Sequence, residues 1–165
     1  MLTINGRPLD LPGDALYITH VYGGLDTLDF DMAPQHELYP DIAEEVPVVY
    51  GGNRYLIKSI NERRSVSTVH CELDLDALRA RCHYQVLSED KTLQEVLAAC
   101  MPEGWTVNGA QQSTVRRTME LEGCTDYDIV MQAMETYGVC YSWKTETREL
   151  TVIIPEDIQP SGAYL

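Results

Sequence analysis

The clearest pattern of apolar and polar positions in the chain runs from Thr125 to Ile154. Thr125 and Asp128 have the spacing of a capping box at a helix start. Five apolar residues then recur at helical spacing: Ile129, Val130, Ala133, Met134 and Tyr137. Gly138 follows, where a left-handed residue ends a helix at no steric cost. The period then becomes two on both sides of a polar turn, at Val139, Tyr141, Trp143, Leu150, Val152 and Ile154. The stretch therefore predicts a helix packed on a β-hairpin, with Trp143 against the helix.

A second helix is predicted upstream by a similar signature. Thr92 and Glu95 form another capping box, and apolar residues follow at helical spacing: Leu93, Val96, Leu97 and Cys100. Pro102 and Gly104 end this helix, a short strand covers 105–107, and another strand alternates over 115–121. The two helix-then-strand units are compatible with a weak internal duplication, or with two ordinary helices in one α+β domain.

The first part of the chain shows strand patterns. Strands are expected over 15–22, 28–32, 46–50, 55–60 and 66–73, with Gly23-Gly24 and Gly51-Gly52-Asn53 as turns. Pro47 has no N–H to donate to a ladder, so its strand should begin there or lie at a sheet edge. Short strands joined by glycine and proline turns predict a small antiparallel sheet that curls toward a barrel.

These patterns together predict the α+β class. Residues 1–81 form a β-rich, barrel-like domain, and residues 82–154 form an α+β domain with two helices packed on short antiparallel strands. A tail, 155–165, is expected to lead toward a further downstream segment.

Net charge is the composition's main deviation from an ordinary globular protein. The chain has 165 residues, with 12 Lys+Arg against 26 Asp+Glu, which gives −14. This charge argues against nucleic-acid binding and against an anionic membrane surface, because both need cationic patches. No signal-peptide pattern and no apolar stretch of membrane-spanning length is visible. The five cysteines are an odd, scattered set, as expected for reduced thiols in a cytosolic product.

No candidate group of residues assembles a catalytic, cofactor or metal site. The adjacent pairs His70-Cys71 and Cys82-His83 point to opposite strand faces and match no zinc spacing. Four aspartates in Asp-x-Asp pairs lack the rest of a calcium loop and indicate solvated faces: Asp29, Asp31, Asp74 and Asp76. Cys124, before a helix start, is the best candidate for a lowered thiol pKa, although a cysteine in a core-facing cap is commoner than a nucleophilic cysteine. The glycine pairs lack the following helix of a phosphate loop, and Arg63-Arg64 and Arg116-Arg117 indicate local salt bridges.

Two stretches nevertheless resemble a known family. Thr27–Phe30, a proline-flanked loop and residues 44–58 (EEVPVVYGGNRYLIK) are similar to the opening of prophage tail proteins, the tail-associated endopeptidase or minor structural proteins of long-tailed phages. Residues 118–154 resemble the family's run of strand, glycine, capped helix, glycine and hairpin. Ser161–Leu165 is similar to the point where the family chain returns from this α+β insert to its first barrel.

The resemblance implies a structural role in the virion tail tip, after assembly in the host cytoplasm. It implies a baseplate hub module: a homotrimeric ring that links the tail tube to receptor-binding or lytic parts, with distal tail, tube and tape-measure proteins as partners. Family members usually continue well beyond a Gly-Ala-Tyr segment. Any peptidase or lytic activity is therefore expected outside these residues, and the chain itself is expected to be no enzyme.

Two alternatives remain open. A cell-wall-directed peptidase fragment would need a Cys-His or metal cluster that only the fold brings together. A carbohydrate-binding module would need an exposed aromatic platform, for which Trp105 and Trp143 are candidates, although Trp143 and Tyr141 lie on apolar faces and favour the core.

Overall fold

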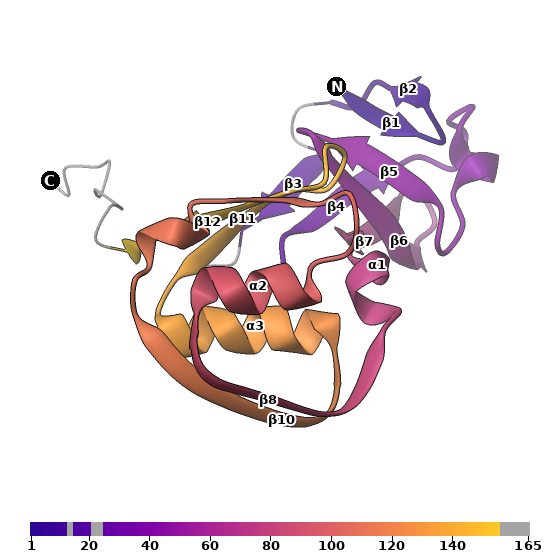
Figure 1. Cartoon of the computed structure of the whole chain (residues 1–165). Helices are drawn as coiled ribbons and strands as arrows, with labels where there is room; N and C mark the ends of the chain where they lie inside the picture. Colours follow the sequence, from indigo (N-terminus) through magenta and orange to yellow (C-terminus); the bar gives the residue numbers. More distant parts are fainter. Residues whose placement is uncertain (13–14, 21–24, 156–165) are drawn as a thin grey trace, which may run out of the picture. The chain divides into compact units, whose positions relative to one another are not determined.

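The computed structural model describes residues 1–12, 15–20 and 25–155 (Figure 1). These residues form two compact units. The first comprises Met1–Asp74 with Lys144–Thr147, and the second comprises Leu75–Trp143 with the described residues from Arg148 onward. The predicted turn at Gly23-Gly24 and the predicted tail, from residue 156 onward, lie outside the described residues.

The first unit is a seven-stranded antiparallel sheet that curls into a half-barrel. Its strands are β1 (Leu2–Ile4), β2 (Arg7–Leu9), β3 (Leu16–Thr19), β4 (Thr27–Met32), β5 (Pro47–Tyr50), β6 (Asn53–Glu62) and β7 (Ser67–Leu73), with a 3-10 turn η1 (Tyr39–Asp41) between β4 and β5. The spatial order is β2-β1-β5-β6-β7-β4-β3, so β2 and β3 are the two edges. The predicted α+β class and the curling antiparallel sheet are confirmed.

Alternation along β4 builds one side of the core of this sheet. Leu28 and Phe30 are fully buried and Met32 is 1% exposed, whereas Asp29 and Asp31 lie on the other face. The neighbouring strand β7 repeats the pattern, with every second residue buried. A one-residue slip would exchange apolar and acidic side chains between the faces, so the register of this pair is strongly specified.

Pro47 begins β5, as one of the two readings of its sequence predicts. The other reading, a sheet edge, is wrong, because β5 pairs with β1 on one side and β6 on the other. A proline is tolerated at this first position because the hydrogen bonds around it use carbonyls as acceptors: the Val46 carbonyl accepts from the Ile57 N–H, and the Pro47 carbonyl accepts from the Asn5 N–H. The β5–β6 turn is Gly51-Gly52, both with positive φ (63° and 83°), and Asn53 already belongs to β6.

The segment Lys144–Thr147 belongs to the first unit through hydrogen bonds to β6 and the turn before it. The Thr145 N–H donates to Asn53 Oδ1 at 3.0 Å, and the Arg54 N–H donates to Thr145 Oγ1 at 2.7 Å. The Glu146 N–H donates to the Gly52 carbonyl. Asn53 and Thr145 are each 9% exposed, so these bonds satisfy polar groups that water hardly reaches.

The second unit combines three helices with two small sheets. Its elements are α1 (Asp76–Arg79), β8 (Cys82–Thr92), α2 (Leu93–Cys100), β9 (Thr106–Asn108), a 3-10 turn η2 (Ala110–Gln112), β10 (Arg116–Thr125), α3 (Asp126–Tyr137), β11 (Cys140–Lys144) and β12 (Glu149–Ile153). The strands β8 and β10 form a long antiparallel ribbon that curves around the paired helices α2 and α3 (Figure 1). Within the described ranges, no helix has the length and apolar character that a membrane span requires.

The two capped helices are confirmed residue by residue. Thr92 and Thr125 are N-caps of complete capping boxes with Glu95 and Asp128, and Gly138 ends α3 at φ 65°. All nine predicted core positions of these helices are buried: Leu93, Val96, Leu97, Cys100, Ile129, Val130, Ala133, Met134 and Tyr137.

Three details differ from the sequence prediction. The one-turn helix α1 precedes the two expected ones. The strand β8 lies in a part of the chain for which the sequence predicted no strand; most of its side chains are exposed, so no alternation marks it. The short strand β9 pairs with β12 in parallel rather than antiparallel, because α3 and β11 lie between the two strands in the chain.

Candidate functional site

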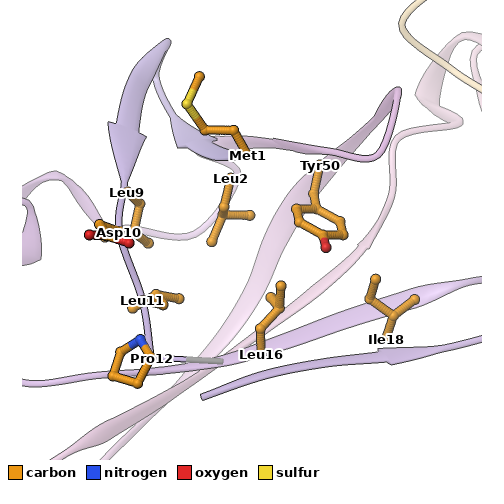
Figure 2. A pocket seen from close by; sticks show the side chains of 9 residues that line it. All are labelled: Met1, Leu2, Leu9, Asp10, Leu11, Pro12, Leu16, Ile18 and Tyr50. Atoms are coloured by element: carbon orange, nitrogen blue, oxygen red, sulfur yellow. The ribbon is translucent and has the colours of Figure 1, made fainter. Parts of the chain in front are cut away.

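The principal candidate site is a groove of the first unit that both edges of the half-barrel sheet line (Figure 2). Its volume is about 440 Å³. Nine residues line it: Met1, Leu2, Leu9, Asp10, Leu11, Pro12, Leu16, Ile18 and Tyr50. Because β2 and β3 are the last strands at the two ends of the sheet order, the groove is the opening of the half-barrel.

The groove is built by strand alternation at the two edges. Leu2 and Leu9 face each other across the β1–β2 pair and are each 4% exposed. On β3, Leu16 and Ile18 stand two residues apart and so share a face. Figure 2 shows side chains from both edges around a common space. The floor is therefore aliphatic, with the Tyr50 ring at one side.

The lining of the groove is predominantly apolar. Asp10 carries the one charged side chain among the lining residues, and the Tyr50 hydroxyl is another polar group.

A second concave region, in the second unit, contains the most buried charge of the described chain. Asp126, at the start of α3, has a side chain 3% exposed. It accepts two hydrogen bonds from Arg81, from Nε at 2.7 Å and Nη2 at 3.0 Å, and lies 2.7 Å from His83 Nε2. The hydrogen bond to Asp126 raises the pKa of Arg81.

Arg81 also joins this cluster to the end of α2. Its Nη2 donates to the Ala99 carbonyl at 3.0 Å, one of the carbonyls that a helix end leaves unsatisfied. The carboxylate, guanidinium and imidazole are thus engaged in connecting β8, α2 and α3. We assign this cluster to structure rather than to chemistry.

The histidine and cysteine candidates separate in space. His70 lies within 2.7 Å of Asp29 on the outer sheet face, while Cys71 is fully buried and burial raises the pKa of its thiol to about 12. Cys82 is exposed beside the engaged His83. No three His, Cys, Asp or Glu side chains of residues 1–12, 15–20 and 25–155 converge in a way that could hold a metal ion.

Of the two readings of Cys124, the lowered pKa is wrong and the core-facing position is confirmed. Burial, followed by the charge of Asp128, raises the pKa of this thiol instead of lowering it. The residue is 4% exposed and faces the core, so desolvation of the thiolate outweighs the nearby helix start.

Three of the other charged candidates form local ion pairs. Asp74 bonds to Arg54, Asp76 to Arg79, and Arg116 to Asp90.

The sequence did not single out the groove, because its residues come from strands that only the non-sequential sheet order brings together. The one local signal was the apolar, β-prone stretch at 15–22.

Comparison with solved structures places this architecture among known folds. The prophage tail protein gp18 from Listeria monocytogenes matches with a TM-score of 0.63 and 14% sequence identity, over 87% of this chain and 45% of gp18. This chain has the fold of a prophage tail protein. The resemblance to that family, proposed from the sequence, is thereby confirmed at the level of structure over most of the chain.

Two further prophage or tail proteins show weaker similarity to this tail-protein fold. The 43 kDa tail protein of prophage MuSo2 from Shewanella oneidensis gives a TM-score of 0.48 at 17% identity, over 92% of this chain and 51% of that one. A tail protein from Neisseria meningitidis gives 0.44 at 13% identity, over 78% and 41%. No family model and no curated protein sequence matches the chain.

Proposed function

We propose that the chain is a structural module of a phage or prophage tail, placed at the tail tip as part of the baseplate hub. The observation that carries the proposal is the shared fold with gp18, over 87% of this chain. This chain spans 45% of gp18, so the proposal concerns this module and not every activity of a longer tail protein. An open half-barrel with an apolar groove suits a part that is completed by contacts within an assembly.

The proposed partners are other tail proteins: the tail tube, the distal tail protein and the tape measure, around a homotrimeric ring of this module. The net charge of −14 supports a further part of the proposal. Acidic side chains facing a central channel repel the phosphate backbone, so a genome passes without binding.

Immunogold electron microscopy of induced phage particles tests the location. Antibodies against this chain should label the end of the tail opposite the head. Label distributed along the tail, or on the capsid, contradicts the hub role but leaves a tail role intact; particles without label contradict both.

We further propose that the module has no enzymatic activity of its own. Support comes from the groove lining, which holds one charged side chain, and from the structural engagement of the Arg81–Asp126–His83 cluster. Purified protein incubated with peptidoglycan should release no soluble peptides or sugars. Digestion that one point mutation abolishes would contradict this proposal and restore the peptidase alternative.

One observation favours carbohydrate binding as a second candidate function. A pocket of about 270 Å³ in the second unit contains the half-buried Trp105 ring and the amides of Gln94 and Gln111, with no charged side chain in its lining. A tryptophan face and neutral amides are the groups that stack on and hydrogen-bond to a sugar ring. Calorimetric titration with tri-N-acetylchitotriose should then give binding that Trp105→Ala abolishes, and absence of heat removes this candidate.

A further inference from the structure

The pocket of about 270 Å³ beside Trp105 is built by one short stretch of the second unit. All its lining residues lie between positions 94 and 111. The helix α2, the strand β9 and the turn η2 supply them, together with the loop that follows the helix. The pocket therefore depends on local chain geometry, and not on which strands of a sheet lie at its edges.

One part of the lining is a side of α2 that does not belong to the core. The four buried residues of this helix form its core face. Gln94, Ala98 and Met101 are spaced by four and three residues, so they form a second stripe along the helix, and all three line the pocket. Gln94 and Ala98 are exposed. The small side chain of Ala98 leaves a recess between the amide and the thioether.

The rest of the lining centres on the Trp105 ring and the turn η2. An edge-to-face contact holds this ring against Trp143, with 5.8 Å between the ring centroids, and such a contact occupies at most one face of the ring. Ala110, the first residue of η2, is 1% exposed, and Gln111 beside it is exposed. The pocket thus combines one aromatic ring and two neutral amides with small or aliphatic side chains.

An acetamido group matches this lining better than a hydroxyl group does. Its methyl fits the small apolar surfaces of Ala98 and Ala110, and its N–H and C=O complement the C=O and NH₂ of a glutamine amide. A hydroxyl supplies neither the methyl nor the amide. Because none of the described lining residues is charged, an ammonium group in the same place would lose its water without gaining a counter-charge.

We infer that the pocket beside Trp105 selects N-acetylated amino sugars, with the sugar ring on the tryptophan and the acetyl methyl in the recess at Ala98. This inference rests on the carbohydrate-binding candidate and deepens it. Sugar binding as such needs a ring to stack on and amides to bond to, whereas a preference for the acetamido group needs the small side chains of Ala98 and Ala110. Ala98 is thus the residue that determines specificity.

Two trisaccharides that differ only in the substituent on the second ring carbon test the inference on the full chain. Tri-N-acetylchitotriose carries acetamido groups there and cellotriose carries hydroxyls, and both are neutral. Calorimetric titration should show at least tenfold tighter binding of tri-N-acetylchitotriose, which is the discrimination that one small group in a fitted pocket provides. In saturation-transfer NMR, the acetyl methyl protons should receive more saturation than any ring proton.

Two variants of neighbouring alanines on α2 locate the preference. Ala98→Leu fills the recess and should weaken binding of tri-N-acetylchitotriose at least tenfold, to the level of cellotriose. Ala99→Leu is the matched control, because Ala99 is also exposed on α2 and lies outside the pocket lining. This variant should bind tri-N-acetylchitotriose within about twofold of the parent protein, and a thermal melt of each variant verifies folding.

Three results would overturn the acetamido preference but leave sugar binding intact. They are equal affinity for the two trisaccharides, saturation of ring protons without the acetyl methyl, and equal loss of binding in the two alanine variants. The absence of heat and of saturation transfer with both trisaccharides at millimolar concentration would instead remove sugar binding and the preference together. The inference and the candidate function can therefore fail separately.

Discussion

At the scale of single residues, the Asp126 carboxylate offers the sharpest test of what holds the second unit together. Asp126→Asn keeps the shape but removes the charge that faces Arg81 and His83. The arginine is 53% exposed, so water screens part of the pair, and we expect a loss of roughly 1–3 kcal/mol in unfolding free energy. Asp90→Asn is the control. Its carboxylate is 78% exposed beside Arg116, and its loss should cost less than about 0.5 kcal/mol in a urea melt.

Replacing Gly109 should also lower the free energy of unfolding. A Cβ built on Gly109 would stand 2.7 Å from the Val152 carbonyl oxygen, and its φ is +81°. Gly123 has φ +56° but nothing within 4 Å of its Cβ. Both alanine variants should lose about 1–2 kcal/mol from the left-handed backbone, and Gly109→Ala roughly 1–3 kcal/mol more from the clash. Equal denaturation midpoints for the two variants would contradict the close approach.

The buried thiols predict a dependence on alkaline pH. Burial raises the pKa of both Cys71 and Cys100 to about 12. In the unfolded chain a thiol ionises at about pH 8.5. The two buried thiols therefore contribute their full stabilisation below that pH, and this contribution is lost as the pH rises toward 12. Thermal melts across this range should show the decline.

At pH 8, iodoacetamide should modify the exposed Cys82 and leave Cys71 and Cys100 unmodified until the protein unfolds.

At the scale of elements, the β11–β12 hairpin depends on an aromatic cluster. Trp143 is 5% exposed and makes edge-to-face contacts with Trp105 and Tyr141, at centroid distances of 5.8 and 5.9 Å. Trp143→Ala should destabilise the second unit by about 3–5 kcal/mol, the usual cost of emptying a large core site. Tyr84→Ala, at a residue 93% exposed on β8, should leave the melting temperature unchanged. Similar melts for the two variants would show that the tryptophan is not a core residue.

The elements also show where sequence reasoning succeeds and where it fails. Capped, amphipathic helices such as α3 are predictable because Thr125, Asp128 and Gly138 act within a few residues of one another. The strand β8 was missed because a two-stranded ribbon buries little, so residues 82–92 carry no period of two. The groove could not be found from local patterns, since the pairing of β1 with β5 and of β4 with β7 decides which strands become edges.

At the scale of the whole molecule, net charge sets the expected behaviour toward nucleic acid. With −14 and few lysines and arginines to release counterions, the protein should leave the electrophoretic mobility of double-stranded DNA unchanged at physiological salt. A complex that forms at physiological salt and dissociates as salt is raised would contradict the proposed acidic channel.

The hydrogen bonds of Thr145 to β6 set an order of events during translation. Their partners, Asn53 and Arg54, lie 92 and 91 positions earlier in the chain. A ribosome adds about 5–20 residues per second, so the nascent half-barrel waits roughly 5–20 s for these bonds. The ribosome makes most of the second unit in that interval. The first sheet to emerge is thus among the last to be completed.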